Sequence, residues 1–277
     1  MLALSFSLTP PLSVFPSMSL VIKKNLPSAT IILSRPDKRN ALTRQMLSDL
    51  LQAFDDLHQE RKVRAVILTG AGTAFCAGMD LAEMQETAKL PEREAWEQWY
   101  EDANLYRDLV VKMREFPKPI IAAINGPAVA GGMGLVCASD LVLAAPEAQF
   151  SLPEPRRGIV AGIVSPLLVF RVGSSHASNL LLTTRTIDAE EGRRIGLVHE
   201  IVKGDLLWVR GQELAGEIAK SAPEAIQLTK RLLNETIGES VGTQLSAGAA
   251  ASATARTTEA AVEGLTAFLE KREPKWI

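Results

Sequence analysis

Apolar runs and amphipathic segments alternate along the first 200 residues of the chain. Four short apolar runs are typical of buried strands: residues 28–34, 63–70, 119–126 and 140–145. Between the first two runs, apolar side chains recur at helical spacing from Leu42 to Leu57, which predicts an amphipathic helix. Because predicted strands and helices alternate along the chain, the pattern predicts an α/β fold with a largely parallel sheet and right-handed crossovers.

The pattern changes beyond residue 200, where only helical periodicity remains. The alanine-rich stretch over 245–261 is expected to form a packed helix, because alanine is the best helix former. We therefore expect an α/β core over 18–200 and a helical C-terminal region over 201–277. Residues 1–17 contain several prolines and no Lys or Arg, which fits neither a secretory signal nor a transit peptide, so we expect a disordered extension.

Composition argues against several classes of function. The formal net charge of −2 over 277 residues provides no basic field for nucleic acid, and no apolar run has the length of a membrane span. Cys76 and Cys137 lie far apart in a chain with only three histidines, so we expect no metal site. Both cysteines are expected to pack as reduced thiols in a cytoplasmic protein.

Two glycine-rich turns follow predicted strands. The stretch "TGAGTAFCAGMDLAEM" (69–84) lacks the dinucleotide-binding pattern, because Phe75 stands where that pattern requires glycine. The stretch "NGPAVAGGMGLVCASD" (125–140) contains four glycines, which allow the backbone to approach a ligand closely. Turns after parallel strands meet at one edge of the sheet, where exposed N–H groups are suited to hold a carbonyl oxygen or a developing oxyanion.

A third stretch, "AQFSLPEPRRG" (148–158), places Glu154 between Pro153 and Pro155. The prolines restrict the backbone around the carboxylate, which suits a positioned general acid or base. A solvated loop carboxylate is the alternative, and the spacing alone does not decide between them.

Together these stretches resemble the crotonase superfamily, also called the enoyl-CoA hydratase/isomerase family. The resemblance runs from about Ser19 to the C-terminus and also includes "RPDKRNAL", "GLVHEIV" and "GLTAFLEKREPKW" in the family's order. It implies a crotonase-like spiral of ββα units and a helical C-terminal region that forms a homotrimer or a homohexamer. It also implies an acyl-CoA thioester substrate, with coenzyme A as part of that substrate and no separate cofactor.

The resemblance also assigns roles to single residues. It implies an oxyanion hole made by the peptide N–H groups of Met79 and Gly131, and it implies that Asp140 is structural. The residues matched to CoA binding are Lys38, Arg39, Ala41, Ala77, Asp80 and Leu81. Lys38 and Arg39 are also chemically suited to phosphate, although a solvated charge run is the alternative.

The resemblance breaks at one position. Hydratases of the family carry two glutamates; Glu154 matches the second, whereas the first falls on Gly134. A single carboxylate can still remove a proton at C2 and return it at C4, so we expect enoyl-CoA double-bond isomerisation. Hydration by Glu154 alone is the main alternative, and decarboxylation and thioester hydrolysis remain open. A dienoyl-CoA isomerase is disfavoured, because its extra aspartate would fall on Gly162.

Two readings from other classes are weighed against an acyl-CoA isomerase. A non-catalytic acyl-CoA-binding paralogue is consistent with the missing glutamate, and the retained "AGMD" and "PEP" motifs argue against it. A serine or cysteine hydrolase lacks a GxSxG elbow, and Cys76 is expected to be a packing residue. The acyl chain is not evident from the sequence. The segment 85–109 contains Trp96, Trp99 and Tyr100, for which we favour packing over lining the acyl pocket.

Overall fold

The computed structural model describes residues 19–236 and 239–275, so the predicted extension over 1–17 lies outside the described residues. The strands are β1 (Leu20–Asn25), β2 (Ser28–Leu33), β3 (Ala65–Gly70), β4 (Ile120–Ile124), β5 (Ala128–Val129), β6 (Leu141–Ala144), β7 (Gln149–Ser151), β8 (Ile187–Asp188) and β9 (Glu200–Ile201). The helices are α1 (Arg44–Gln59), α2 (Leu81–Thr87), α3 (Glu92–Glu115), α4 (Gly131–Ala138), α5 (Val164–Thr183), α6 (Ala189–Arg194), α7 (Leu207–Ala219), α8 (Pro223–Arg231), α9 (Glu239–Ala255) and α10 (Glu259–Leu269). Short helical turns are η1 (Pro36–Lys38), η2 (Glu154–Arg157), η3 (Gly204–Leu206) and η4 (Leu232–Thr236).

The main sheet has the strand order β1-β2-β3-β4-β6-β9. Strand β1 runs antiparallel to β2, and every other neighbouring pair in this sheet is parallel. Each of the four predicted apolar runs contains one strand of this sheet (β2, β3, β4 and β6). The predicted α/β class and the largely parallel sheet are therefore confirmed.

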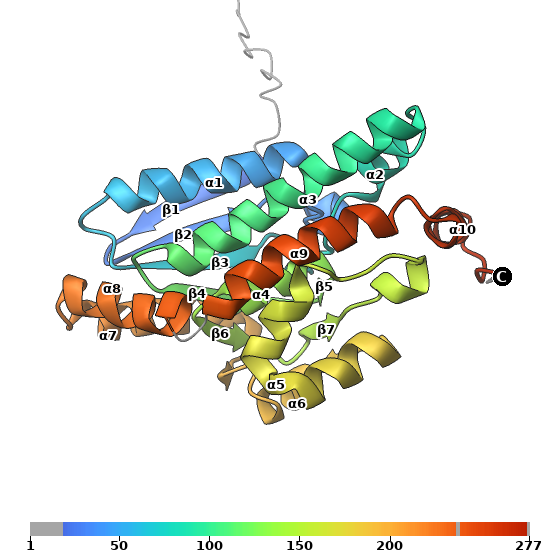
Figure 1. Ribbon diagram of the computed structural model, residues 1–277. Helices are drawn as coiled ribbons and strands as arrows, with labels where there is room; N and C mark the ends of the chain where they lie inside the picture. Colours follow the sequence, from blue (N-terminus) through green and yellow to red (C-terminus); the bar gives the residue numbers. More distant parts are fainter. Residues whose placement is uncertain (1–18, 237–238, 276–277) are drawn as a thin grey trace, which may run out of the picture.

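A second, smaller sheet has the order β5-β7-β8. The chain passes from β4 in the main sheet to β5 in the small sheet and then into α4, and it repeats this path through β6, β7 and α5 (Figure 1). Each repeat therefore adds one strand to each sheet before a helix returns the chain. This is the expected spiral of ββα units, and its turns bring the carboxyl ends of β3 and β4 together.

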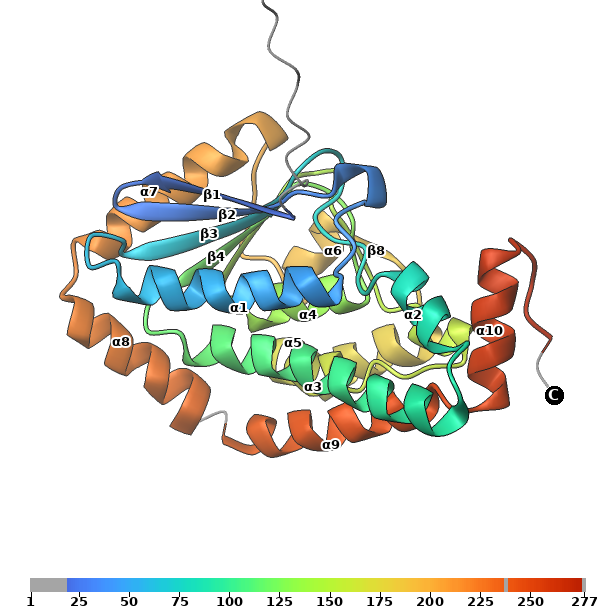
Figure 2. The same ribbon diagram turned by 90° about the horizontal axis from the view of Figure 1, so that it is seen from above.

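Helices cover both faces of the main sheet. On one face α7 packs Leu207 and Ala215 against Ile67, Ile121 and Leu143. Helix α1 lies on the opposite face, and α3 and α9 form further layers beyond it (Figure 2). Among the residues described, every helix is too short or too polar to cross a bilayer.

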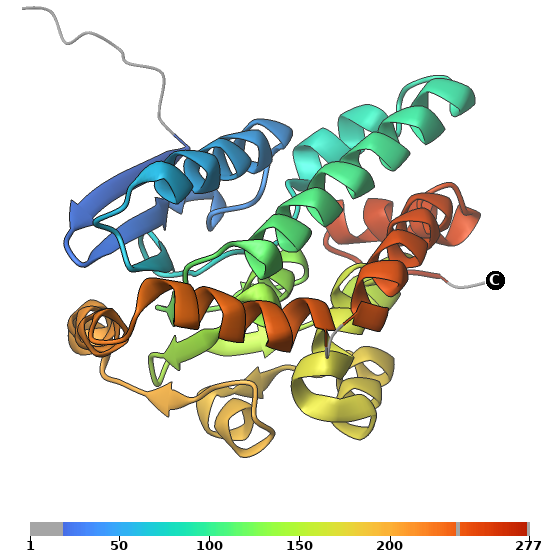
Figure 3. The ribbon, with the colours of Figure 1, turned by 60° about the vertical axis from the view of Figure 1, so that its left-hand side comes forward.

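The described elements from η3 onward are all helical, as the sequence pattern predicts. The alanine-rich segment forms most of α9, which packs along α3 (Figure 3). Its buried hydrophobic residues Val241, Leu245, Ala249 and Ala253 recur every fourth position. Residues at this spacing form a narrow stripe along one side of the helix, and the two alanines in it are small enough to allow a neighbouring helix to approach closely.

A buried ion pair ties the C-terminal helices to the sheet. The Lys230 ammonium on α8 donates to Asp140 Oδ2 at 2.7 Å and to the carbonyls of Met113 and Lys118 at 3.1 Å. Asp140 Oδ2 also accepts a hydrogen bond from the Ile120 N–H, where β4 begins. The structural role expected of Asp140 thus corresponds to fastening one strand and one distant helix.

Asp140→Asn is expected to lower the free energy of unfolding by about 3 kcal/mol, because it leaves the buried Lys230 ammonium without a countercharge. Adding Lys230→Met should recover part of this loss, and urea denaturation of both variants measures it. The exposed pair Lys24–Glu60 provides the control, since Glu60→Gln should leave the free energy of unfolding nearly unchanged. Equal losses for the two single variants would contradict the special role of the buried pair.

Candidate active site

Glu154 is a buried carboxylate at the start of η2. Its side chain is 6% exposed, and its Oε2 atom has no hydrogen-bond partner among the described residues. Burial raises the pKa of this carboxyl to about 7, because the charged form is poorly solvated there. The structure therefore excludes the solvated loop carboxylate that the sequence left open as the alternative for this residue. A carboxyl with a pKa near neutrality is suited to both accept and return a proton.

Two peptide N–H groups lie together where the two glycine-rich turns meet. A Cβ built on Gly131 would lie 3.6 Å from the Met79 nitrogen, and one built on Gly78 would lie 3.0 Å from the Gly131 nitrogen. Neither the Met79 N–H nor the Gly131 N–H donates a hydrogen bond within the described part of the chain. The two donors are therefore free to bind an oxygen atom of a ligand.

The backbone that presents these donors is conformationally unusual. Gly78 has φ +90°, and a Cβ there would lie 2.8 Å from the Ala130 Cβ, so only glycine fits. Ala130 has φ +52° and ψ −121°, which is a strained conformation for alanine. It precedes Gly131, the first residue of α4, whose N-terminal dipole adds positive potential at the same place. Strain held in this way is typical of functional sites.

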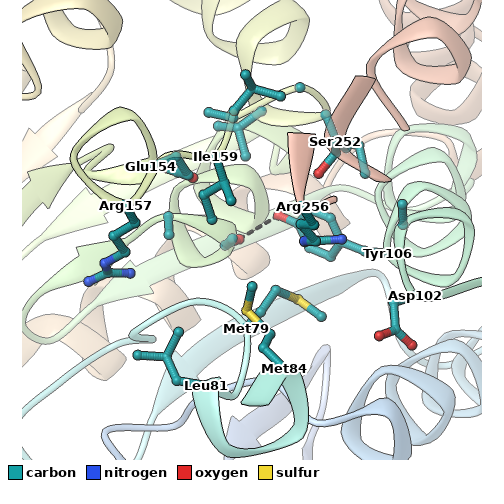
Figure 4. Close-up of a pocket in the computed structure, with 18 residues that line it drawn as sticks. Met79, Leu81, Met84, Asp102, Tyr106, Glu154, Arg157, Ile159, Ser252 and Arg256 are labelled. Atoms are coloured by element: carbon teal, nitrogen blue, oxygen red, sulfur yellow. Dashed lines mark hydrogen bonds between the residues drawn. The ribbon is translucent and has the colours of Figure 1, made fainter. Parts of the chain in front are cut away.

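One cavity brings the predicted catalytic groups together. Met79, Gly131 and Glu154 line it, and their labelled neighbours in Figure 4 surround the same space. The remaining lining residues are largely apolar: Leu81, Met84, Ala103, Tyr106, Ala130, Ile159, Val160, Ala161, Gly162, Ile163 and Val164, with the polar side chains of Asp102, Arg157, Ser252 and Arg256. An apolar cavity with a few convergent polar groups is the usual form of a small-molecule site.

The space beside Gly134 is filled by Tyr106 of α3. A Cβ at position 134 would lie only 1.9 Å from the Tyr106 Oη atom and 3.2 Å from a methyl group of Val164. The Tyr106 hydroxyl donates to the Gly131 carbonyl at 2.5 Å, and burial keeps its pKa well above the ordinary value. A neutral phenol that braces the glycine turn therefore stands where a longer side chain at 134 would have to go.

The second carboxylate in the cavity is already paired. Asp102 accepts hydrogen bonds from Arg44 Nε at 2.6 Å and from Arg44 Nη2 at 2.8 Å, with a further one from Gln98. Both of its oxygens are therefore used by this bidentate pair. Of the two carboxylates that line the cavity, Glu154 is the one with a free oxygen.

An adjoining groove collects all six residues that the resemblance assigns to CoA. It is lined by Lys38, Arg39, Ala41, Ala77, Asp80 and Leu81, and it shares Met79, Leu81 and Arg157 with the cavity. Asp80 has structural contacts as well: its Oδ1 accepts from the Ala82 N–H at the start of α2, and its Oδ2 pairs with Arg35 at 2.7 Å. The groove thus leads from two exposed cations to the buried carboxylate.

The aromatic residues of 85–109 have different surroundings. Trp99 is buried, whereas Trp96 and Tyr100 are exposed and stack on each other with ring centroids 5.6 Å apart. None of the three lines the cavity, and Trp99 is the one that packs in the interior as expected. Sequence reasoning missed Tyr106 in this segment and missed Arg256. A lone arginine within an alanine-rich stretch of sequence was the available signal for Arg256.

Both cysteines are buried, as expected of packing residues. Burial raises the pKa of Cys76 and of Cys137 to about 12, so neither forms a thiolate at neutral pH. Cys76 lies beside the glycine turn, where its carbonyl accepts from the Val129 N–H at 2.9 Å. Its place in the site is therefore architectural.

Residues 25–277 match the model of a known family, described as enoyl-CoA hydratase/isomerase. The chain belongs to the enoyl-CoA hydratase/isomerase family. A relative from Thermus thermophilus is 42% identical over 248 residues, which cover 90% of this chain and 96% of that protein. The short-chain-enoyl-CoA hydratase of Clostridium acetobutylicum is 32% identical over 257 residues, which cover 92% of this chain and 96% of that enzyme.

Solved structures of the family share the fold. The crystal structure of an enoyl-CoA hydratase/isomerase from Xanthobacter autotrophicus matches with a TM-score of 0.83 at 29% identity and covers 92% of this chain and 97% of that one. The corresponding structure from Pseudoalteromonas atlantica matches with a TM-score of 0.81 at 29% identity and covers 94% and 100%. The resemblance drawn from the motifs is therefore confirmed for the family and the fold.

Gly134→Ala is expected to lower the free energy of unfolding by about 1–3 kcal/mol, because the added Cβ collides with the Tyr106 hydroxyl. In a Tyr106→Phe background the loss should be smaller, since the nearest remaining atom is ring Cζ at 3.0 Å. A double-mutant cycle by urea denaturation measures this coupling. Gly216→Ala on α7, where a Cβ meets nothing within 4 Å, is the control and should not destabilise. An equal loss in both backgrounds would contradict the contact.

The raised pKa of Glu154 also predicts how stability depends on pH. The carboxyl has a pKa of about 7 when folded and about 4.5 when unfolded, so the folded state binds the extra proton between these values. Stability from this group is fully present below about pH 4.5 and is lost as pH rises to 7. Glu154→Gln should therefore stabilise the protein at pH 8 by roughly 2–3 kcal/mol more than at pH 5, measured by urea unfolding. A pH-independent difference would show that the carboxyl titrates normally.

Proposed function

We propose that this chain is an acyl-CoA enzyme that shifts a double bond by way of an enolate. The observation that carries the proposal is the placement of one unpartnered, buried carboxylate in the same cavity as two free N–H groups. Glu154 serves as the acid and base, and the N–H groups of Met79 and Gly131 form the oxyanion hole. Preorganised hydrogen-bond donors stabilise a developing oxyanion more than a neutral carbonyl, which lowers the activation barrier for enolate formation.

The proposed reaction converts a 3-enoyl-CoA to a 2-enoyl-CoA. The Glu154 carboxylate takes a proton from C2, and the electron pair of the C–H bond moves onto the thioester oxygen as a dienolate forms. The protonated Glu154 then delivers the same proton to C4. The thioester carbonyl re-forms, and the product has its double bond between C2 and C3. No water is consumed, so a single carboxylate suffices.

The surroundings of Glu154 favour isomerisation over hydration. Hydration by two carboxylates requires a second free carboxylate beside the acyl group, whereas Asp102 is held by Arg44 and Tyr106 fills the space beside Gly134. The adjoining groove supports this proposal, because Lys38 and Arg39 line it and carry the charge that suits the phosphates of CoA. The thioester would enter the cavity past Met79 and Leu81, which line both spaces.

Hydration is the second candidate because of the names of relatives. The Clostridium acetobutylicum relative is named a short-chain-enoyl-CoA hydratase, and one from Syntrophomonas wolfei is named a crotonyl-CoA hydratase at 32% identity. In this chain, hydration would rest on Glu154 alone. A binding protein without catalysis is the third possibility, and the same assay separates all three.

Isomerisation of 3-hexenoyl-CoA and hydration of crotonyl-CoA should be measured side by side. We expect the wild-type protein to be faster in isomerisation, and Glu154→Gln to lower kcat by about 10²–10⁴-fold because the proton acceptor is lost. Glu147→Gln, an exposed glutamate seven residues earlier, is the matched control and should leave kcat unchanged.

Faster hydration than isomerisation would favour the second candidate. Turnover that survives Glu154→Gln would remove the assigned role of this residue. Tight binding of CoA thioesters with no turnover of either substrate would identify a binding paralogue.

A further inference from the structure

Arg256 directly follows α9 and lines the same cavity as Glu154. Its Nε and Nη1 atoms are sealed from solvent and have no hydrogen-bond partner within the described part of the chain. Leaving a buried cationic N–H unpaired is costly, because the desolvation penalty is not offset by any hydrogen bond. An arginine held in this way is poised for a partner that the protein itself does not supply.

The neighbouring charges of Arg256 do not satisfy it. Asp102 contributes favourable charge at a distance, but both of its oxygens are bonded to Arg44. Glu154 also acts on Arg256 through space, yet its Oε2 atom and the Arg256 Nε and Nη1 atoms have no hydrogen-bond partner in the described part of the chain. The guanidinium lies 5.5 Å from the centroid of the Trp99 ring, which fixes its position but occupies no N–H donor.

A second polar group lies on the same side of the cavity. Ser252 is 7% exposed and lines the cavity near the end of α9, four residues before Arg256, which lines it too. Figure 4 shows Ser252 and Arg256 together, across the cavity from Glu154. The walls around them are largely apolar, including Met84 and Ile163. The pocket therefore has a basic, hydrogen-bonding end and an acidic, catalytic side.

We propose that the acyl group of the substrate ends in a carboxylate that is bound by Arg256 and Ser252. This inference rests on the proposed function, since it names the class of acyl-CoA that the same cavity accepts: monothioesters of dicarboxylic acids. A planar guanidinium matches a carboxylate in shape and charge and binds it more strongly than a neutral group. In the proposed function Lys38 and Arg39 of the adjoining groove bind the phosphates of CoA, which leaves Arg256 for the acyl end.

Binding of saturated thioesters, which have no double bond to shift, tests this inference directly. Succinyl-, glutaryl- and adipyl-CoA are compared with butyryl-, valeryl- and hexanoyl-CoA by isothermal titration calorimetry, so each pair has the same carbon number and the same CoA charge. We expect the dicarboxylic member of at least one pair to bind roughly 10–100-fold more tightly, which is the range of a charge-assisted hydrogen-bonded pair.

Variants then assign the preference to Arg256. Arg256→Met should reduce the ratio of the two dissociation constants to near one, and Arg256→Lys should keep part of it, because the charge remains without the planar fork. Arg93→Met is the matched control: Arg93 is an exposed arginine on α3 that pairs with Glu97, and its loss should leave the ratio unchanged. If Arg256→Met does not fold, the ratios of dissociation constants for the wild-type protein and for Arg256→Lys still test the preference for a terminal carboxylate.

The outcomes separate this inference from the proposed function. No preference above twofold at any chain length, or a preference that persists in Arg256→Met, would overturn the carboxylate site even if 3-enoyl-CoA is isomerised through Glu154. A preference that depends on Arg256 supports the site, and it does so even if no thioester is turned over, in which case the proposed isomerisation fails instead.

Discussion

The burial of the Glu154 carboxylate in a largely apolar cavity is the constraint on which the site depends. Desolvation raises its pKa to about 7 and gives it a proton affinity suited to moving a proton to and from carbon. The same burial destabilises the folded protein whenever the group is ionised, so the surrounding framework must offset that cost. The framework is the ββα spiral, whose two sheets and returning helices hold η2 against the glycine turns.

The glycine turns contribute geometry rather than side-chain chemistry. Gly78 and Gly131 approach so closely that a side chain on Gly78 would collide with Ala130, and the N–H groups of Met79 and Gly131 become neighbours as a result. Tyr106 braces this arrangement by donating to the Gly131 carbonyl. A protonated phenol thereby occupies the volume beside Gly134, which leaves Glu154 as the one free carboxylate of the two that line the cavity.

The cavity contains one paired set of charges and one separated set. Arg44 and Asp102 neutralise each other in a bidentate pair at the periphery, whereas Arg256 and Glu154 lie across the cavity without a direct contact. Separation of this kind keeps a cation and an anion available for two different parts of one ligand. A substrate that carries a thioester at one end and a carboxylate at the other would engage both groups at once.

The sequence by itself determined the α/β class, the helical C-terminal region and the family, because these follow from apolar periodicity and from ordered motifs such as "AGMD" and "PEP". It also marked Glu154, Met79 and Gly131 as candidates, since their local contexts of proline and glycine are visible in the linear pattern. Only the tertiary structure decided that Glu154 is buried, that Tyr106 fills the space beside Gly134, and that Arg256 enters the cavity. These facts depend on contacts between η2, α3, α4 and α9, which lie far apart in sequence, and desolvation and collision are properties of such contacts rather than of any one segment.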